Sequence, residues 1–67
     1  PNVAQTDLVT FGAAVRHARS LKGLTLDQLG HQALGRDNAK SFVSQIEHGK
    51  RQISARTAGR LITFLDM

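Results

Sequence analysis

Apolar residues recur along most of this chain at steps of three and four, the period of an amphipathic α-helix with one buried face. Four segments show the pattern, and their apolar positions are Leu8, Phe11, Val15 and Ala18; Leu26, Leu29 and Ala33; Phe42, Val43 and Ile46; and Ala58, Leu61, Ile62 and Leu65. No alternation of the kind that indicates a β-strand is long enough to compete with them. The sequence therefore predicts an all-α fold, a compact bundle of four short helices.

Residues 1–6 lack this pattern, so we expect a flexible N-terminal arm there and a single helical domain over residues 7–67. A chain of 67 residues is near the lower size limit for a core without disulfides or metals. It has no cysteine, so no disulfide or thiolate metal site can form, and a reducing cytoplasm suits it. No apolar run approaches the ~18 residues of a transmembrane helix, so a membrane is not an expected partner.

Capping residues indicate where the later helices begin. Thr25 followed by Gln28 is a capping-box pattern, in which each side chain bonds the backbone amide of the other residue. Asp37 or Asn38 can cap the third helix, and Ser54 is a suitable N-cap for the fourth. The segment between the second and third helices is therefore expected to be a turn.

Three glycines affect the packing, the stability or the end of a predicted helix. Gly30 costs about 1 kcal/mol relative to alanine within a helix, and its missing side chain would let another helix approach closely. Gly59 lies on the polar side of the last helix and weakens it. Gly49 ends the third helix and is followed by Lys50 and Arg51, whose charges suit both a helix C-terminus and a phosphate backbone.

The third helix is polar on the side opposite its apolar face. That side carries Lys40, Ser41, Ser44 and Gln45, each able to donate or accept a hydrogen bond. A helix with one apolar face and one short, polar, carboxylate-free face can lie in a DNA major groove. Nine Lys and Arg residues against five Asp and Glu give a net charge of +4, which favours a polyanionic partner. Double-stranded DNA is therefore the expected partner.

The segment Ser-Phe-Val-Ser-Gln-Ile-Glu-His-Gly-Lys at residues 41–50 resembles the end of the recognition helix in the phage repressor and Cro superfamily, the XRE-type helix-turn-helix proteins. Residues 11–19 resemble the first helix of that family and residues 23–30 the second. The resemblance implies a lambda-repressor-like fold in which a recognition helix at about residues 39–48 enters the major groove. The chain departs from the family in a longer turn around residues 35–38 and in Leu26, where many members have a glutamine.

The resemblance also implies roles for individual polar residues. Matching the family's recognition helix gives Lys40, Ser41, Ser44 and Gln45 as the expected DNA base contacts. The expected phosphate contacts follow from position: Lys50 and Arg51 after the third helix, Arg36 in the lengthened turn, and Thr25 at the start of the second helix. The most specific of these predictions concerns Gln45, because a glutamine amide can pair with adenine through two hydrogen bonds. The phosphate contacts would set affinity and position rather than sequence preference.

Glu47 is the only glutamate of the chain and lies on the helix expected to read DNA. A free carboxylate there would repel phosphate, so it must be neutralised or turned away from the DNA. The family pairs the matching glutamate with an arginine of the first helix, and Arg19 occupies that position. We therefore expect a structural ion pair between Arg19 and Glu47.

These features together predict a sequence-specific DNA-binding transcriptional regulator, a repressor, in the cytoplasm of a prokaryote or encoded by a phage. A homodimer is expected, with Phe64 and Met67 extending an apolar surface beside the core stripe of the last helix. Two alternatives stay open. One is an antitoxin or restriction-modification controller of the same fold, with a toxin or other protein as partner, and the other is a protein-interaction module that has lost DNA binding.

The sequence predicts neither a catalytic site nor a cofactor. His17, His31 and His48 have no metal-ligand spacing with one another, and no cysteine is present to complete a site. No nucleophile elbow and no glycine-rich phosphate loop surrounds the serines. We therefore expect a binding protein and not an enzyme.

Overall fold

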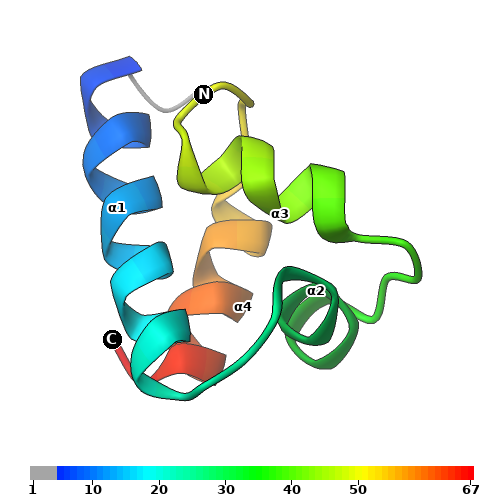
Figure 1. Cartoon of the computed structure of the whole chain (residues 1–67). Coiled ribbons are helices and arrows are strands. Elements are labelled where there is room, and N and C mark those ends of the chain that lie inside the picture. Colours follow the sequence, from blue (N-terminus) through cyan, green and yellow to red (C-terminus); the bar gives the residue numbers. More distant parts are fainter. Residues whose placement is uncertain (1–4) are drawn as a thin grey trace.

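Four α-helices and their connections form the described part of the chain. The computed structural model describes residues 5–67, and its helices are α1 Gln5–Leu21, α2 Leu26–Leu34, α3 Lys40–Glu47 and α4 Ala55–Leu65 (Figure 1). These residues contain no strand, which confirms the predicted all-α class and the number of helices. Helix α1 begins inside the expected arm, at Gln5, and the rest of that arm lies outside the described residues.

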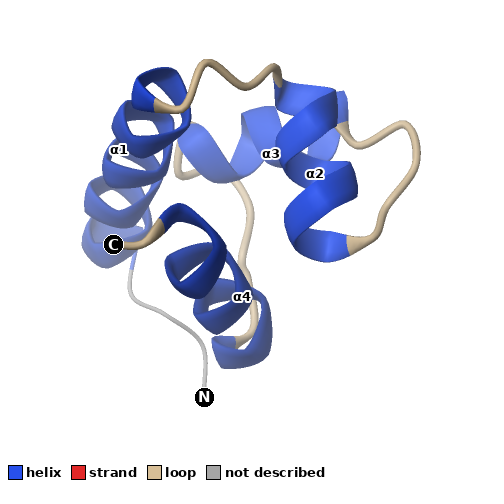
Figure 2. Cartoon of the chain, turned by 90° about the horizontal axis from the view of Figure 1, so that it is seen from below, coloured by secondary structure: helices blue, strands red, loops and turns tan. Residues whose placement is uncertain are grey.

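The helices pack around a shared centre. Each of α1 and α2 contacts both α3 and α4, and Figures 1 and 2 show α3 and α4 lying between α1 and α2. Every helix supplies the core with one residue that is 0% exposed, namely Val15, Leu29, Val43 and Leu61. Helix α3 is therefore held from both sides, and its remaining surface faces outward.

Two of the predicted caps form. The Thr25 amide donates to Gln28 Oε1 at 2.8 Å, and the Gln28 amide donates to Thr25 Oγ1 at 3.1 Å, which completes the capping box of α2. At the start of α4 the Thr57 amide donates to Ser54 Oγ at 3.1 Å. Local sequence therefore determines where these two helices begin.

The prediction that Asp37 or Asn38 caps α3 is wrong. The N-cap is Ala39, which is only 1% exposed and offers no capping side chain. An ideal Cβ at Gly30 would overlap the Ala39 Cβ, so α2 and α3 touch at these two small residues, as expected from Gly30. Helix α3 therefore begins where Ala39 packs on Gly30, without a polar side chain as its cap.

One residue of the predicted core stripe of α4 is not buried. Leu61 and Leu65 are 0% and 4% exposed, but Ile62 is 40% exposed. Successive helical residues differ by about 100° in direction, so Ile62 points away from the line through Leu61 and Leu65. None of the helices in residues 5–67 is long and apolar enough to cross a membrane.

The contact between Gly30 and Ala39 can be tested by adding one methyl group. We expect Gly30→Ala to lower the free energy of unfolding by about 1–3 kcal/mol, because the new methyl must displace α3. Gly59→Ala is the matched control, since nothing lies within 4 Å of a Cβ there. It should raise stability by up to about 1 kcal/mol through helix propensity alone. Chemical denaturation measures both, and equal effects would contradict a close approach at Gly30.

Candidate nucleic-acid interface

The four predicted base-contact residues lie together on the outer side of α3. Lys40, Ser41 and Gln45 are exposed and Ser44 is half-buried. With Leu26 of α2 they line one hollow of about 280 Å³. The N-terminal end of α2 therefore borders this surface, which we call the α3 face, defined by Lys40, Ser41, Ser44 and Gln45.

The carboxylate of Glu47 points away from the α3 face and into the domain. Arg19 Nε donates to Glu47 Oε2 at 2.6 Å and Arg19 Nη2 donates to Oε1 at 3.3 Å, in a two-point contact. The Glu47 side chain is 3% exposed and that of Arg19 17%. Arg19 Nη1 also donates to the Leu24 carbonyl at 2.8 Å. The predicted ion pair is thus present, and it joins α1, α3 and the connection before α2.

The end of α3 is closed by backbone hydrogen bonds around Gly49. The Gly49 amide donates to the Ile46 carbonyl at 3.1 Å and the Lys50 amide to the Gln45 carbonyl at 2.9 Å, the pattern of a Schellman motif. Gly49 has a φ of 68°, and a Cβ there would crowd Val9 of α1. The chain therefore leaves α3 abruptly, with the Lys50 side chain exposed just beyond the helix.

Two of the predicted phosphate contacts meet at Phe42, on the edge of α3. The guanidinium carbon of Arg36 lies 4.0 Å from the centroid of the Phe42 ring and that of Arg51 lies 4.5 Å from it. Arg51 Nη1 also donates to Gln45 Oε1 at 3.2 Å. These contacts place two cations beside the α3 face. Both arginines were predicted from the sequence, but their shared contact with Phe42 was not.

Thr25 is exposed at the start of α2, but its backbone amide is already bound. The capping box directs that amide to Gln28 Oε1 and leaves the Thr25 hydroxyl hydrogen free to donate. A phosphate contact from Thr25 would therefore use the hydroxyl group rather than the amide. The position next to Leu26 keeps Thr25 near the α3 face.

The structure does not bring the two predicted dimer-interface residues together. Phe64 is half-buried and lines a hollow beside Ala33 of α2, whereas Met67 lines a different hollow beside Leu21 of α1. The reason is Asp66, whose φ of 58° turns the chain so that the Met67 amide bonds the Ile62 carbonyl. Phe64 and Met67 therefore line separate hollows, and their place in a dimer interface stays a prediction. Met67 is 45% exposed and Leu21 is 76% exposed.

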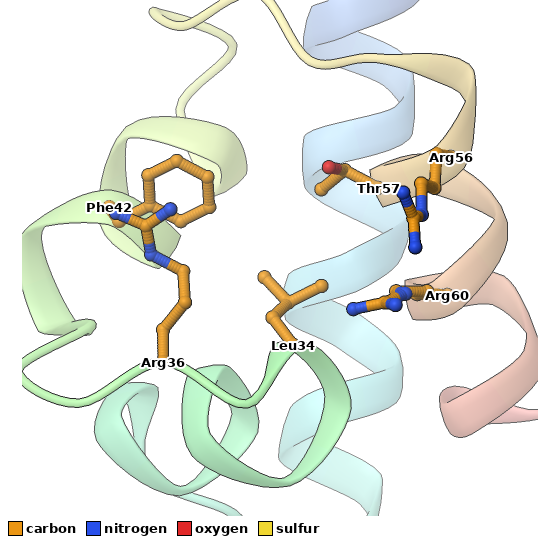
Figure 3. Close-up of a pocket in the computed structure, with 6 residues that line it drawn as sticks. All are labelled: Leu34, Arg36, Phe42, Arg56, Thr57 and Arg60. Atoms are coloured by element: carbon orange, nitrogen blue, oxygen red, sulfur yellow. The ribbon is translucent and has the colours of Figure 1, made fainter.

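Another hollow, of about 350 Å³, was not foreseen from the sequence. It lies between the turn after α2, the edge of α3 and the first half of α4, and its lining consists of Leu34, Arg36, Phe42, Arg56, Thr57 and Arg60 (Figure 3). We call it the arginine hollow. The sequence did contain a sign of this site. Arg56 and Arg60 lie four residues apart near the start of α4, with no acidic residue between them.

Comparison of the chain with protein-family models, with curated proteins and with solved structures found no match. In residues 5–67 no group of three or more His, Cys, Asp or Glu side chains could hold a metal ion.

The Arg19–Glu47 pair should be energetically coupled. Glu47→Ala would leave Arg19 without its partner, and Arg19→Ala would leave a buried carboxylate, at a cost of up to about 3–5 kcal/mol each. The double variant should lose less than the sum of the two single losses, because only one interaction is removed. Thermal or chemical unfolding of the three variants measures this coupling. Strict additivity would show that the two side chains do not act as a pair in solution.

Proposed function

We propose that this domain is a helix-turn-helix transcriptional regulator that binds double-stranded DNA with α3 in the major groove. The observation that carries the proposal is the α3 face, which is outward, polar and free of carboxylates because Glu47 is bound to Arg19. Major-groove base edges present hydrogen-bond donors and acceptors that such side chains can read. The net charge of +4 supports a polyanionic partner.

The surroundings of α3 also fit a helix lying between two phosphate backbones. On one side the start of α2, at Thr25 and Leu26, adjoins Lys40 and Ser44. A helix N-terminus attracts anions through its free amides and its dipole. On the Phe42 side lie Arg36 and Arg51, held over the aromatic ring. Cationic or dipolar groups on both sides would bind both walls of a groove.

Gln45 is the residue we propose to read a base, and Arg51 is the residue that orients it. An amide oxygen has two lone pairs, and the hydrogen bond from Arg51 uses one of them. The other lone pair and the amide nitrogen remain for the N6 and N7 groups of adenine. A side chain that is already oriented loses less conformational entropy on binding.

A homodimer on a two-fold related operator belongs to this proposal. Symmetric pairs of recognition helices commonly read half-sites about one DNA turn, roughly 34 Å, apart. Phe64 packs against the core, and the large apolar residues left exposed are Val9, Leu21, Ile62 and Met67. Leu21 and Met67 line one hollow, so we propose these two for the subunit contact. An antitoxin or a restriction-modification controller would use the same DNA contacts and differ in its protein partner.

DNA binding should weaken steeply as salt concentration rises. Each phosphate neutralised by Arg36, Lys50 or Arg51 releases counterions, with a slope of roughly −0.9 per contact in a plot of log K against log salt. Fluorescence anisotropy with a labelled duplex gives the slope. An affinity that does not change with salt would contradict the proposed function.

Gln45→Ala and Lys50→Ala should have different effects. Gln45→Ala should cost about 1–3 kcal/mol on the preferred sequence and relax the base preference at one position, with random duplex bound nearly as before. Lys50→Ala should weaken binding to all sequences alike, because it would contact phosphate. The measurement is competition binding on duplexes selected from a random pool and on random duplex. Identical behaviour of the two variants would mean that α3 is not docked as proposed.

A further inference from the structure

The arginine hollow contains three cationic side chains that come from two parts of the chain. Arg36 belongs to the turn after α2, and Arg56 and Arg60 come from successive turns of α4. Figure 3 shows Arg56 and Arg60 reaching from α4 into the hollow, with Arg36 and Phe42 on the opposite side and Leu34 between them. Cations therefore flank the hollow on both sides.

The positive charge of the hollow is not balanced by any carboxylate of the described residues. Among residues 5–67 no carboxylate lies within salt-bridge distance of Arg36, Arg56 or Arg60. Like charges one helical turn apart repel each other, as Arg56 and Arg60 must. A cation in the first turn of a helix also opposes the helix dipole, and Arg56 lies in the first turn of α4. Stability of the free domain therefore does not explain Arg56 and Arg60.

Three further contacts orient groups of the hollow toward a ligand with several acceptor oxygens. Arg36 is held by the Phe42 ring at 4.0 Å and by its backbone amide, which donates to the Gly30 carbonyl at 3.2 Å. The Ser54 hydroxyl donates to Thr57 Oγ1 at 3.2 Å, so the Thr57 hydroxyl keeps its own hydrogen for another acceptor. The lining thus offers three guanidinium groups and one hydroxyl donor.

We propose that the arginine hollow is a binding site for a phosphate group. A phosphate at neutral pH carries between one and two negative charges and accepts paired hydrogen bonds from a planar guanidinium group. The site is separate from the α3 face, since the two hollows share no lining residue. Its ligand is the phosphate of a free molecule or of a nucleic-acid strand, and the recognition chemistry is the same for both. The proposal does not depend on base reading by α3.

The test begins with the free domain and two probes, inorganic phosphate and pyrophosphate. In NMR titrations near pH 7.5 both should shift the amide signals of Arg36, Thr57 and Arg60. Arg60→Gln should weaken pyrophosphate binding by about tenfold, as expected for loss of a charge-assisted hydrogen bond. Arg16→Gln is the matched control, because Arg16 is exposed on α1 and lines none of these hollows. It should leave the affinity unchanged.

The melting temperature separates a binding role from a structural one. Without ligand, Arg60→Gln should melt at the same temperature as the wild type or higher, because a repulsive charge is removed. With pyrophosphate, the wild type should gain more stability than the variant. The proposal is wrong if neither probe binds, or if Arg16→Gln weakens binding as much as Arg60→Gln does.

Adding duplex DNA to the domain loaded with pyrophosphate identifies the source of the phosphate. Release of pyrophosphate, together with weaker duplex binding by Arg60→Gln, supports a site filled by the DNA strand. Simultaneous binding of both supports a site for a free phosphorylated molecule. If pyrophosphate binds but no duplex binds, the phosphate site is supported and the proposed DNA-binding function is contradicted.

Discussion

The two-point contact between Arg19 and Glu47 is the interaction on which the rest of the site depends. It ties α1 to α3, and the remaining guanidinium nitrogen binds the Leu24 carbonyl before α2. A buried carboxylate is tolerated only when it is paired and hydrogen-bonded, and Glu47 meets both conditions. The only glutamate of the chain is thereby kept off the outer side of α3. The interaction that holds α3 in place also sets the charge of the face that α3 presents.

Small residues fix how closely α3 sits within the bundle. A Cβ at Gly12 would collide with the Ile46 and Glu47 backbone, and one at Gly30 with Ala39. Helices α1 and α2 therefore both approach α3 at glycines, from two sides. These contacts bury Val43 and Ile46 and leave Ser41 and Gln45 exposed. The hydrophobic core and the proposed interface are thus two consequences of one arrangement.

The helices, the Thr25 and Ser54 caps and the Arg19–Glu47 pair could be predicted because each follows from short-range spacing or from a family resemblance. The start of α3 at Ala39 could not, since it depends on packing against Gly30 in another helix. The separation of Phe64 from Met67 follows from the left-handed turn at Asp66, a position that has no glycine to signal it. Likewise, the meeting of Arg36 and Arg51 at Phe42 depends on the paths of two loops. Local sequence determines such tertiary contacts only weakly.

The central claim, that α3 presents its outer face to DNA, is tested most directly by mapping a bound duplex on the isotope-labelled domain by NMR. The account predicts that the largest shifts fall on the backbone of Lys40, Ser41 and Ser44 and on the side-chain amide of Gln45. Smaller shifts should appear at Lys50 and Arg51. Shifts confined to other surfaces, with the Gln45 amide unchanged at saturation, would contradict the claim.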